Sequence, residues 1–201
     1  MGISVSGTNG KSCQFNNRGW LYILHTAEDY GWEPQGIVHA NNWPDHEITC
    51  PVYKHQDMWA GCNCTQAFGG ERHYDYSGND MKMVLPDDAK SFATALQKFL
   101  QDLASFEQAV DTAYNERERS VFVEKARDIL SDLIRSESHS EVYISQLNEL
   151  SAPIQPHYEV RDDLTIAMLI RAYLIRTGTP DWVERIEELV RMAESGDLII
   201  H

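Results

Sequence analysis

The most decisive stretch of the chain is residues 86–106, PDDAKSFATALQKFLQDLASF. Pro86 suits the first turn of a helix because no amide donor is needed there, and the carboxylates of Asp87 and Asp88 face the positive end of the helix dipole. Apolar residues then recur at three- and four-residue steps and form one face, made of Ala89, Phe92, Leu96, Phe99, Leu103 and Phe106. We therefore expect a long amphipathic helix that packs against a sheet.

The residues before this helix predict a small antiparallel sheet and one further helix. Asn9-Gly10 tolerates the positive φ angles of a type I′ turn, so the alternating apolar residues on either side of it predict a β-hairpin. These residues are Ile3, Val5, Cys13 and Phe15. Asn16 or Asn17 then caps a helix that ends at Gly31 and has a core face of Trp20, Leu24, Ala27 and Tyr30. Residues 74–84 predict one strand, or a hairpin interrupted at Gly78-Asn79.

The residues after 106 predict a helix-rich C-terminal half. Helices are expected at residues 122–134, 142–150, 164–175 and 183–193, with a linker at 136–140 and an edge strand at 198–200. The predicted fold class is α+β, with the N-terminal hairpin and the central strand in a small antiparallel sheet that packs with five or six helices. We interpret the chain as a single domain, 1–201, with a long irregular loop insertion at 33–72 and a helical insertion or annex at 107–178.

The composition is that of a folded and strongly acidic protein. Hydrophobic residues make up 42% of the 201 residues, which excludes the composition of disordered chains. The 31 acidic and 17 basic residues give a net charge of −14, which repels phosphate backbones and anionic lipids. We therefore expect no direct binding of nucleic acid or membranes. The same charge favours encounter with a basic protein, although many proteins are acidic only for solubility.

The sequence also indicates where the protein works. Its longest apolar candidate, residues 164–175, contains Arg171 and falls short of the ~20 residues that a membrane helix requires. The start of the chain has no basic segment followed by an apolar stretch, so we expect a cytoplasmic protein. The irregular spacing of Cys13, Cys50, Cys62 and Cys64 suits reduced thiols better than a disulfide framework.

The loop at residues 33–72 is rich in cysteine and histidine. The candidate metal ligands are Cys50, His55, Cys62 and Cys64, with His46 and His73 nearby in the sequence. Thiolate and imidazole are the ligands that Zn²⁺ prefers, and four of them complete a tetrahedron. Zinc modules usually carry paired Cys-x2-Cys knuckles, whereas this chain has one Cys62-x-Cys64. Our interpretation is that no metal or other cofactor is bound, and the zinc site is kept as the alternative.

The same loop and the strand after it are rich in aromatic and cationic side chains. The residues that we single out for binding a ligand or partner are Trp43, Trp59, Arg72, His73 and Tyr74. Aromatic faces stack on a base while arginine holds a phosphate, so these residues together with Tyr76 would suit a nucleotide. The alternative is that the aromatics cover the sheet as ordinary core. Because loops of this length are often functional, we predict that recognition occurs here.

Several landmarks resemble an uncharacterised group of short bacterial and phage proteins. The opening Phe15-Asn16, Gly19-Trp20, Ala27 and Gly31-Trp32-Glu33-Pro34 is similar to the opening of that group. Tyr76-Ser77 and Asn79-Asp80 ahead of the alanine- and leucine-rich helix, and the glycine turn and apolar tail at 196–200, resemble its later landmarks. The resemblance covers roughly half of the chain. It implies a fold, no established catalytic residues, and an association with conflict between bacteria and phages.

These observations favour a non-enzymatic binding protein. The chain has no Gly-x-Ser-x-Gly nucleophile elbow and no Gly-rich phosphate loop, so we expect no enzyme activity. We favour an inhibitor, immunity or anti-defence protein that binds a partner protein. The alternatives are a sponge that sequesters a small nucleotide-type signalling ligand, and a zinc-dependent enzyme. The sequence leaves the partner and the oligomeric state open.

Overall fold

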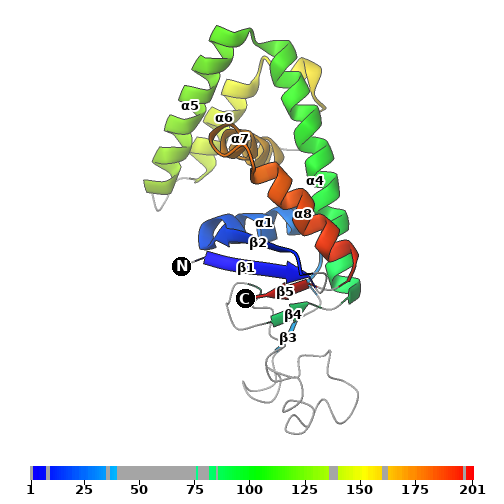
Figure 1. The fold of residues 1–201 in the computed structure, drawn as a ribbon. Helices are drawn as coiled ribbons and strands as arrows, with labels where there is room; N and C mark the ends of the chain where they lie inside the picture. Colours follow the sequence, from blue (N-terminus) through cyan, green and yellow to red (C-terminus); the bar gives the residue numbers. More distant parts are fainter. Residues whose placement is uncertain are drawn as a thin grey trace, which may run out of the picture. The chain divides into compact units, whose positions relative to one another are not determined.

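The computed structural model describes residues 2–7, 10–34, 37–39, 76, 82–84, 86–135, 140–159, 163–196 and 198–201. Figure 1 shows the strands β1 (Gly2–Gly7), β2 (Ser12–Asn16), β3 (Ile37–His39), β4 (Lys82–Val84) and β5 (Leu198–Ile200). The helices of these residues are α1 (Asn17–Asp29), α4 (Pro86–Ala113), α5 (Glu116–Arg135), α6 (Ser140–Ser151), α7 (Asp163–Gly178) and α8 (Trp182–Glu194), with a 3-10 turn at Gln155–His157. The predicted α+β fold, with an antiparallel sheet and five or six helices, is confirmed.

The chain divides into two compact units. Met1–Phe99 together with Glu184–His201 forms the first unit, and Leu100–Val183 forms the second. The first unit contains the sheet, α1, the beginning of α4 and most of α8. The second unit contains the rest of α4 and the helices α5, α6 and α7.

The sheet is antiparallel throughout and has the strand order β2-β1-β5-β4-β3. The expectation that residues 198–200 form an edge strand is wrong, because β5 lies between β1 and β4. Val5 pairs with Ile200 on one side of β5, and Val84 pairs with Leu198 on the other. All four side chains are buried, so the apolar tail is a central strand that completes the core face of the sheet.

The predicted N-terminal hairpin is confirmed, but its turn is one residue longer than a type I′ turn. Gly10 N–H donates to the carbonyl of Gly7 at 3.1 Å, and Gly7 N–H donates to the carbonyl of Lys11 at 3.0 Å. Gly10 has a φ of 78°, in the left-handed region that favours glycine. This pattern is typical of a three-residue hairpin connection that ends with a glycine bulge. Ile3 and Val5 on β1 face Phe15 and Cys13 on β2 and lie on the buried side of the sheet.

Helix α1 begins and ends where the sequence predicts. Asn16 is its N-cap, and its side-chain Oδ1 accepts a hydrogen bond from Gly19 N at 2.7 Å. At the other end Gly31 has a φ of 91°, and the N–H of Trp32 returns to the carbonyl of Ala27 at 2.9 Å. This C-cap directs the Trp32 ring back into the core, which explains why glycine precedes tryptophan at this point.

Aromatic side chains fill the core of the first unit. Phe92, on the predicted face of α4, contacts both Trp20 and Trp32, with ring centroids 6.2 and 4.8 Å away. Phe99 meets Tyr30, the C-cap residue of α1, edge to face with ring centroids 5.6 Å apart. The predicted helix after residue 86 is therefore confirmed, and it extends to Ala113, seven residues beyond Phe106.

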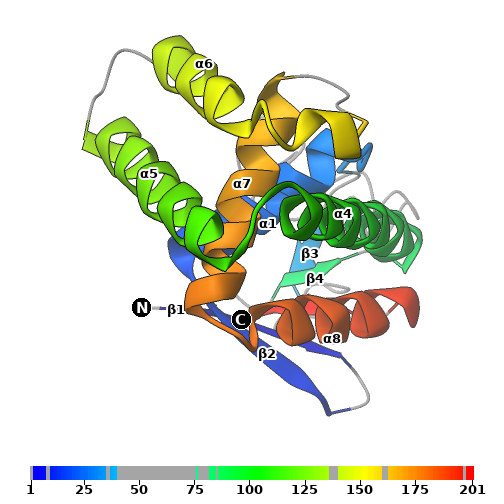
Figure 2. The same cartoon turned by 90° about the horizontal axis from the view of Figure 1, so that it is seen from above.

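The second unit is helical in its described residues. Figure 2 shows α5, α6 and α7 together, and contacts join each pair of these helices. The aromatic core of the unit centres on Phe106, which contacts Tyr158 and Tyr173 edge to face at 5.6 and 6.3 Å. Arg176 and Glu107 form an ion pair that joins α7 to α4.

Residues 37–39, within the range expected to be irregular, form a strand that pairs with β4. The remainder of residues 40–75 lies outside the described residues. Among the described helices, each is too short or too polar to cross a membrane.

Candidate functional site

The residues predicted to bind a ligand or partner lie outside the described residues. They are Trp43, Trp59, Arg72, His73 and Tyr74, and the alternative metal ligands Cys50, His55, Cys62 and Cys64 lie outside as well. Both hypotheses therefore stay predictions. Within the described parts of the chain, no group of three or more histidine, cysteine or acidic side chains is placed to hold a metal ion.

Tyr76 was included in the predicted nucleotide pocket, and that assignment is wrong because Tyr76 belongs to the core. Its ring lies edge to face with Trp32, with centroids 5.0 Å apart, and its side chain is buried. Its carbonyl accepts a hydrogen bond from Trp20 Nε1 at 2.7 Å. The space that Tyr76 shares with Trp20, Trp32 and Phe92 has no volume that a water molecule can enter. Tyr76 is therefore not available to stack on a ligand.

Asp88 is the polar centre of this aromatic core. It lies in the first turn of α4 and is 0% exposed. Its Oδ1 accepts from Trp32 Nε1 at 2.7 Å, and its Oδ2 accepts from the Tyr76 hydroxyl at 2.5 Å. Because a buried carboxylate is costly unless it is hydrogen-bonded, these two donors stabilise Asp88 in the core. In the sequence, Asp88 indicates only an interaction with the helix dipole, because its burial among aromatic side chains depends on residues far away in the chain.

The same contacts bring together residues that lie far apart in the sequence. Trp20, Trp32, Tyr76 and Asp88 form one hydrogen-bonded cluster. The cluster is buried and fully packed, so its residues hold the first unit together. None of them is positioned to contact a substrate.

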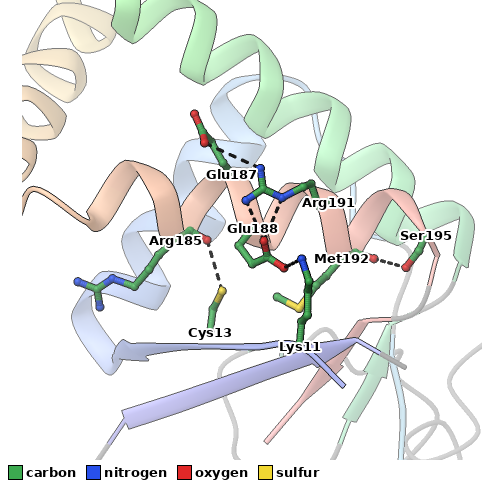
Figure 3. A network of polar contacts seen from close by, with 8 residues as sticks. All are labelled: Lys11, Cys13, Arg185, Glu187, Glu188, Arg191, Met192 and Ser195. Atoms are coloured by element: carbon green, nitrogen blue, oxygen red, sulfur yellow. Dashed lines mark hydrogen bonds and ion pairs between the residues drawn. The ribbon is translucent and has the colours of Figure 1, made fainter. Parts of the chain in front are cut away.

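A second polar network joins the hairpin turn to α8 (Figure 3). Lys11 Nζ and Arg191 Nη2 each lie 2.8 Å from the carboxylate of Glu188. Hydrogen bonds from Lys11 and then Arg191 lower the pKa of Glu188, and the bond to Glu188 raises the pKa of Arg191. Beside them, Cys13 is a free thiol that contacts the Arg185 carbonyl at 3.5 Å. Burial, and then the charge of Glu188, raises the pKa of Cys13, so the thiol stays protonated and unreactive at neutral pH.

An open depression on the described surface combines apolar and charged groups, and we call it the α5–α6 hollow. Its volume is about 640 Å³. It is lined by Tyr114, Asn115, Arg117, Glu118, Val121, Phe122, Lys125, Glu149, Leu150 and Pro153. All of these residues belong to the second unit, and they come from α5, the connection before it, α6 and the turn after α6.

The floor of the α5–α6 hollow is held in place by local contacts. The ring of Tyr114 stacks on Phe122 with centroids 5.2 Å apart, and the Tyr114 hydroxyl donates to the Leu150 carbonyl at 3.0 Å. Burial, and then the charge of Glu118, raises the pKa of Tyr114, so the hydroxyl remains a donor at neutral pH. Asn115 and Glu118 bond each other's backbone N–H groups at 3.1 Å and cap the start of α5.

The rim of the α5–α6 hollow carries available groups. Val121 is 44% exposed, whereas the adjacent Phe122 is 2% exposed. Arg117, Lys125 and Glu149 are exposed, and none of them forms an ion pair with another described residue. The sequence pattern predicts the buried stripe through Phe122 and does not single out Val121. Because Val121 directly precedes Phe122, it lies about 100° around the helix from that stripe, and this position is the sequence signal for its exposure.

A second depression, of about 660 Å³, lies on the other side of α5 between α5 and α7. Its main cation, Arg119, forms an ion pair with Asp111 and a hydrogen bond with Tyr173. Burial raises the pKa of Tyr173, which is therefore neutral. The lining of this depression also contains exposed Arg127, but Val123, its apolar residue on α5, is less exposed than Val121 of the α5–α6 hollow.

Comparison with known proteins adds no assignment to this description. The chain matches no protein-family model, no curated protein and no solved structure.

Proposed function

We propose that the protein works by binding another protein, without catalysing a reaction. We propose further that it is an inhibitor, immunity or anti-defence protein in the conflict between bacteria and phages. The observation that supports the proposal best is the rim of the α5–α6 hollow, where exposed Val121 lies between Arg117 and Lys125.

The arrangement of this hollow suits a protein surface. Protein interfaces combine an apolar centre that becomes buried on binding with a polar rim that stays in contact with water. Val121, Leu150 and Pro153 provide the apolar surface, and the exposed charges of α5 and α6 surround it. The depression is open at the surface, whereas sites for small ligands enclose most of the bound molecule.

The fixed floor also favours binding. Tyr114 is held by Phe122 and by the Leu150 carbonyl, so its side chain does not need to be ordered when a partner arrives. Each side chain ordered on association costs about 0.5–1.5 kcal/mol, and a surface that is already ordered avoids that cost. The predicted contribution of Trp43, Trp59, Arg72, His73 and Tyr74 to binding would add a second contact surface.

Affinity purification of the full chain from the cells that produce it, followed by native mass spectrometry, tests this function. We expect a complex of fixed stoichiometry with one other polypeptide. Val121→Asp should abolish the complex, while Val142→Asp should retain it, because Val142 is an exposed valine (51%) outside the hollow. Recovery of the chain with only a bound molecule of nucleotide size would contradict the proposal and favour the sponge.

A further inference from the structure

The charged rim of the α5–α6 hollow has a regular order along α5. Arg117, Val121 and Lys125 are four residues apart, and each step of four on an α-helix turns by only about 40° beyond a full turn. The three side chains therefore form one row that presents a cation, an apolar group and a second cation. The row spans about 12 Å along the helix axis, at 1.5 Å per residue.

The two cations are available because neither forms an ion pair with another described residue, although exposed Glu149 in the same hollow is unpaired as well. Glu118, the lining carboxylate on α5, caps the helix through Asn115. Arg119 and Arg176 of the second unit are already paired, with Asp111 and Glu107, whereas exposed Arg127 also forms no ion pair with another described residue. Arg117 and Lys125 have no such partner among the described residues. In a chain with a net charge of −14, these two unpaired cations and the exposed valine between them give α5 a basic row, while Glu118 and Glu149 also line the hollow.

From this row we infer the kind of segment that the hollow binds. We propose that it docks an acidic amphipathic helix of the partner protein, with an apolar side chain on Val121 and carboxylates on Arg117 and Lys125. This inference rests on the proposed function. Two helices that pack side by side advance equally per residue, so the partner helix should carry its carboxylates four residues before and four residues after the apolar anchor.

Glu149 limits how the partner helix can lie. It is an exposed carboxylate on the α6 wall of the hollow, and it repels a second carboxylate that approaches it. The acidic groups of the partner should therefore contact the α5 wall. Glu149→Gln should strengthen binding about two- to threefold because it removes that repulsion.

The test uses the full chain and a fluorescein-labelled helical peptide of 15 residues with a central leucine flanked at four-residue steps by glutamates. A second peptide carries lysines in place of the two glutamates. Anisotropy should show that the acidic peptide binds at least about tenfold more tightly than the basic one. The comparison is stringent because the net charge of −14 favours the basic peptide at long range.

Matched variants separate the local site from the overall charge. The double variant Arg117→Glu with Lys125→Glu should bind the acidic peptide at least about tenfold more weakly. The double variant Arg18→Glu with Lys98→Glu should keep its affinity for that peptide within about twofold. Both double variants reverse two exposed cations, and both change the net charge from −14 to −18. Circular dichroism confirms that each variant is folded before its affinity is measured.

Three results would overturn the inference. The first is tighter binding of the basic peptide than of the acidic one. The second is an equal loss of affinity for the acidic peptide in the two double variants, and the third is displacement of the acidic peptide by millimolar ATP. If one of them occurs while Val121→Asp still abolishes the complex with the partner, the acidic-helix assignment is wrong and the proposed function stands. If the chain captures no partner protein at all, the proposed function fails instead.

Discussion

Replacing Asp88 by asparagine should lower the free energy of unfolding by about 3 kcal/mol. The carboxylate accepts from both Trp32 Nε1 and the Tyr76 hydroxyl, whereas an amide of the same shape has one oxygen and turns an N–H toward the other donor. A hydrogen bond to a charged group contributes about 1.5–3 kcal/mol, and loss of the charge beside the start of α4 removes about 0.3–1 kcal/mol more.

Chemical denaturation monitored by tryptophan fluorescence measures this change, and the melting temperature should fall by roughly 6–12 °C. Asp87→Asn is the matched control, because Asp87 is the neighbouring carboxylate in the same first turn and its side chain is 92% exposed. Asp87→Asn removes one negative charge beside the positive end of the α4 dipole and leaves the core contacts unchanged. It should therefore lower the free energy of unfolding by less than about 1 kcal/mol. Unfolding free energies of the two variants that agree within about 0.5 kcal/mol would refute the structural role of Asp88.

Three further perturbations test other parts of the molecule. Leu96→Ala should lower the free energy of unfolding by about 2–5 kcal/mol, because Leu96 is fully buried on α4 and leaves a cavity; an unchanged urea midpoint would contradict this. Glu188→Gln should lower the free energy of unfolding at pH values above the usual carboxyl pKa of 4.5. Because a carboxyl with a lowered pKa stabilises the fold only while it is charged, the difference in free energy of unfolding from the unmodified protein should shrink as the pH falls. A difference that is constant from pH 7 to pH 3 would exclude the ion pair with Lys11 as its cause. Trp59→Ala or Arg72→Ala should weaken partner binding by more than about 1 kcal/mol without changing the melting temperature, and loss of stability in step with affinity would place these residues in the core.

Local signals predicted most of the helices and the hairpin. The stripe through Phe92 and Leu96, the Asn16 cap and Gly31 each act within a few residues, so the sequence is enough to locate them. The position of β5 depends on partners in β1 and β4, all of which lie more than one hundred residues away in the chain. Nothing in residues 198–200 indicates that both edges of the strand are paired, which is why an edge strand was expected.

Candidate site residues were harder to predict because burial decides their role. Tyr76 is an aromatic residue of a type that often lines ligand pockets, but the contacts of its ring and hydroxyl with Trp32 and Asp88 place it in the core. Val121 is an apolar residue of a type that is usually buried, but it lies on the surface because the helices of the second unit cover the other side of α5. Periodicity separates the faces of a helix, whereas the neighbours of each face come only from the three-dimensional structure.

Photo-crosslinking from position 121 tests the central claim most directly. In the full chain, Val121→p-benzoylphenylalanine places a reactive group on the rim of the α5–α6 hollow, and the same replacement at Val142 places it on exposed surface outside the hollow. Irradiation in the producing cells should give one covalent adduct with a single polypeptide from position 121 and none from position 142. Equal adducts from both positions, or none from position 121, would contradict the proposal that this protein works by binding a partner through the hollow.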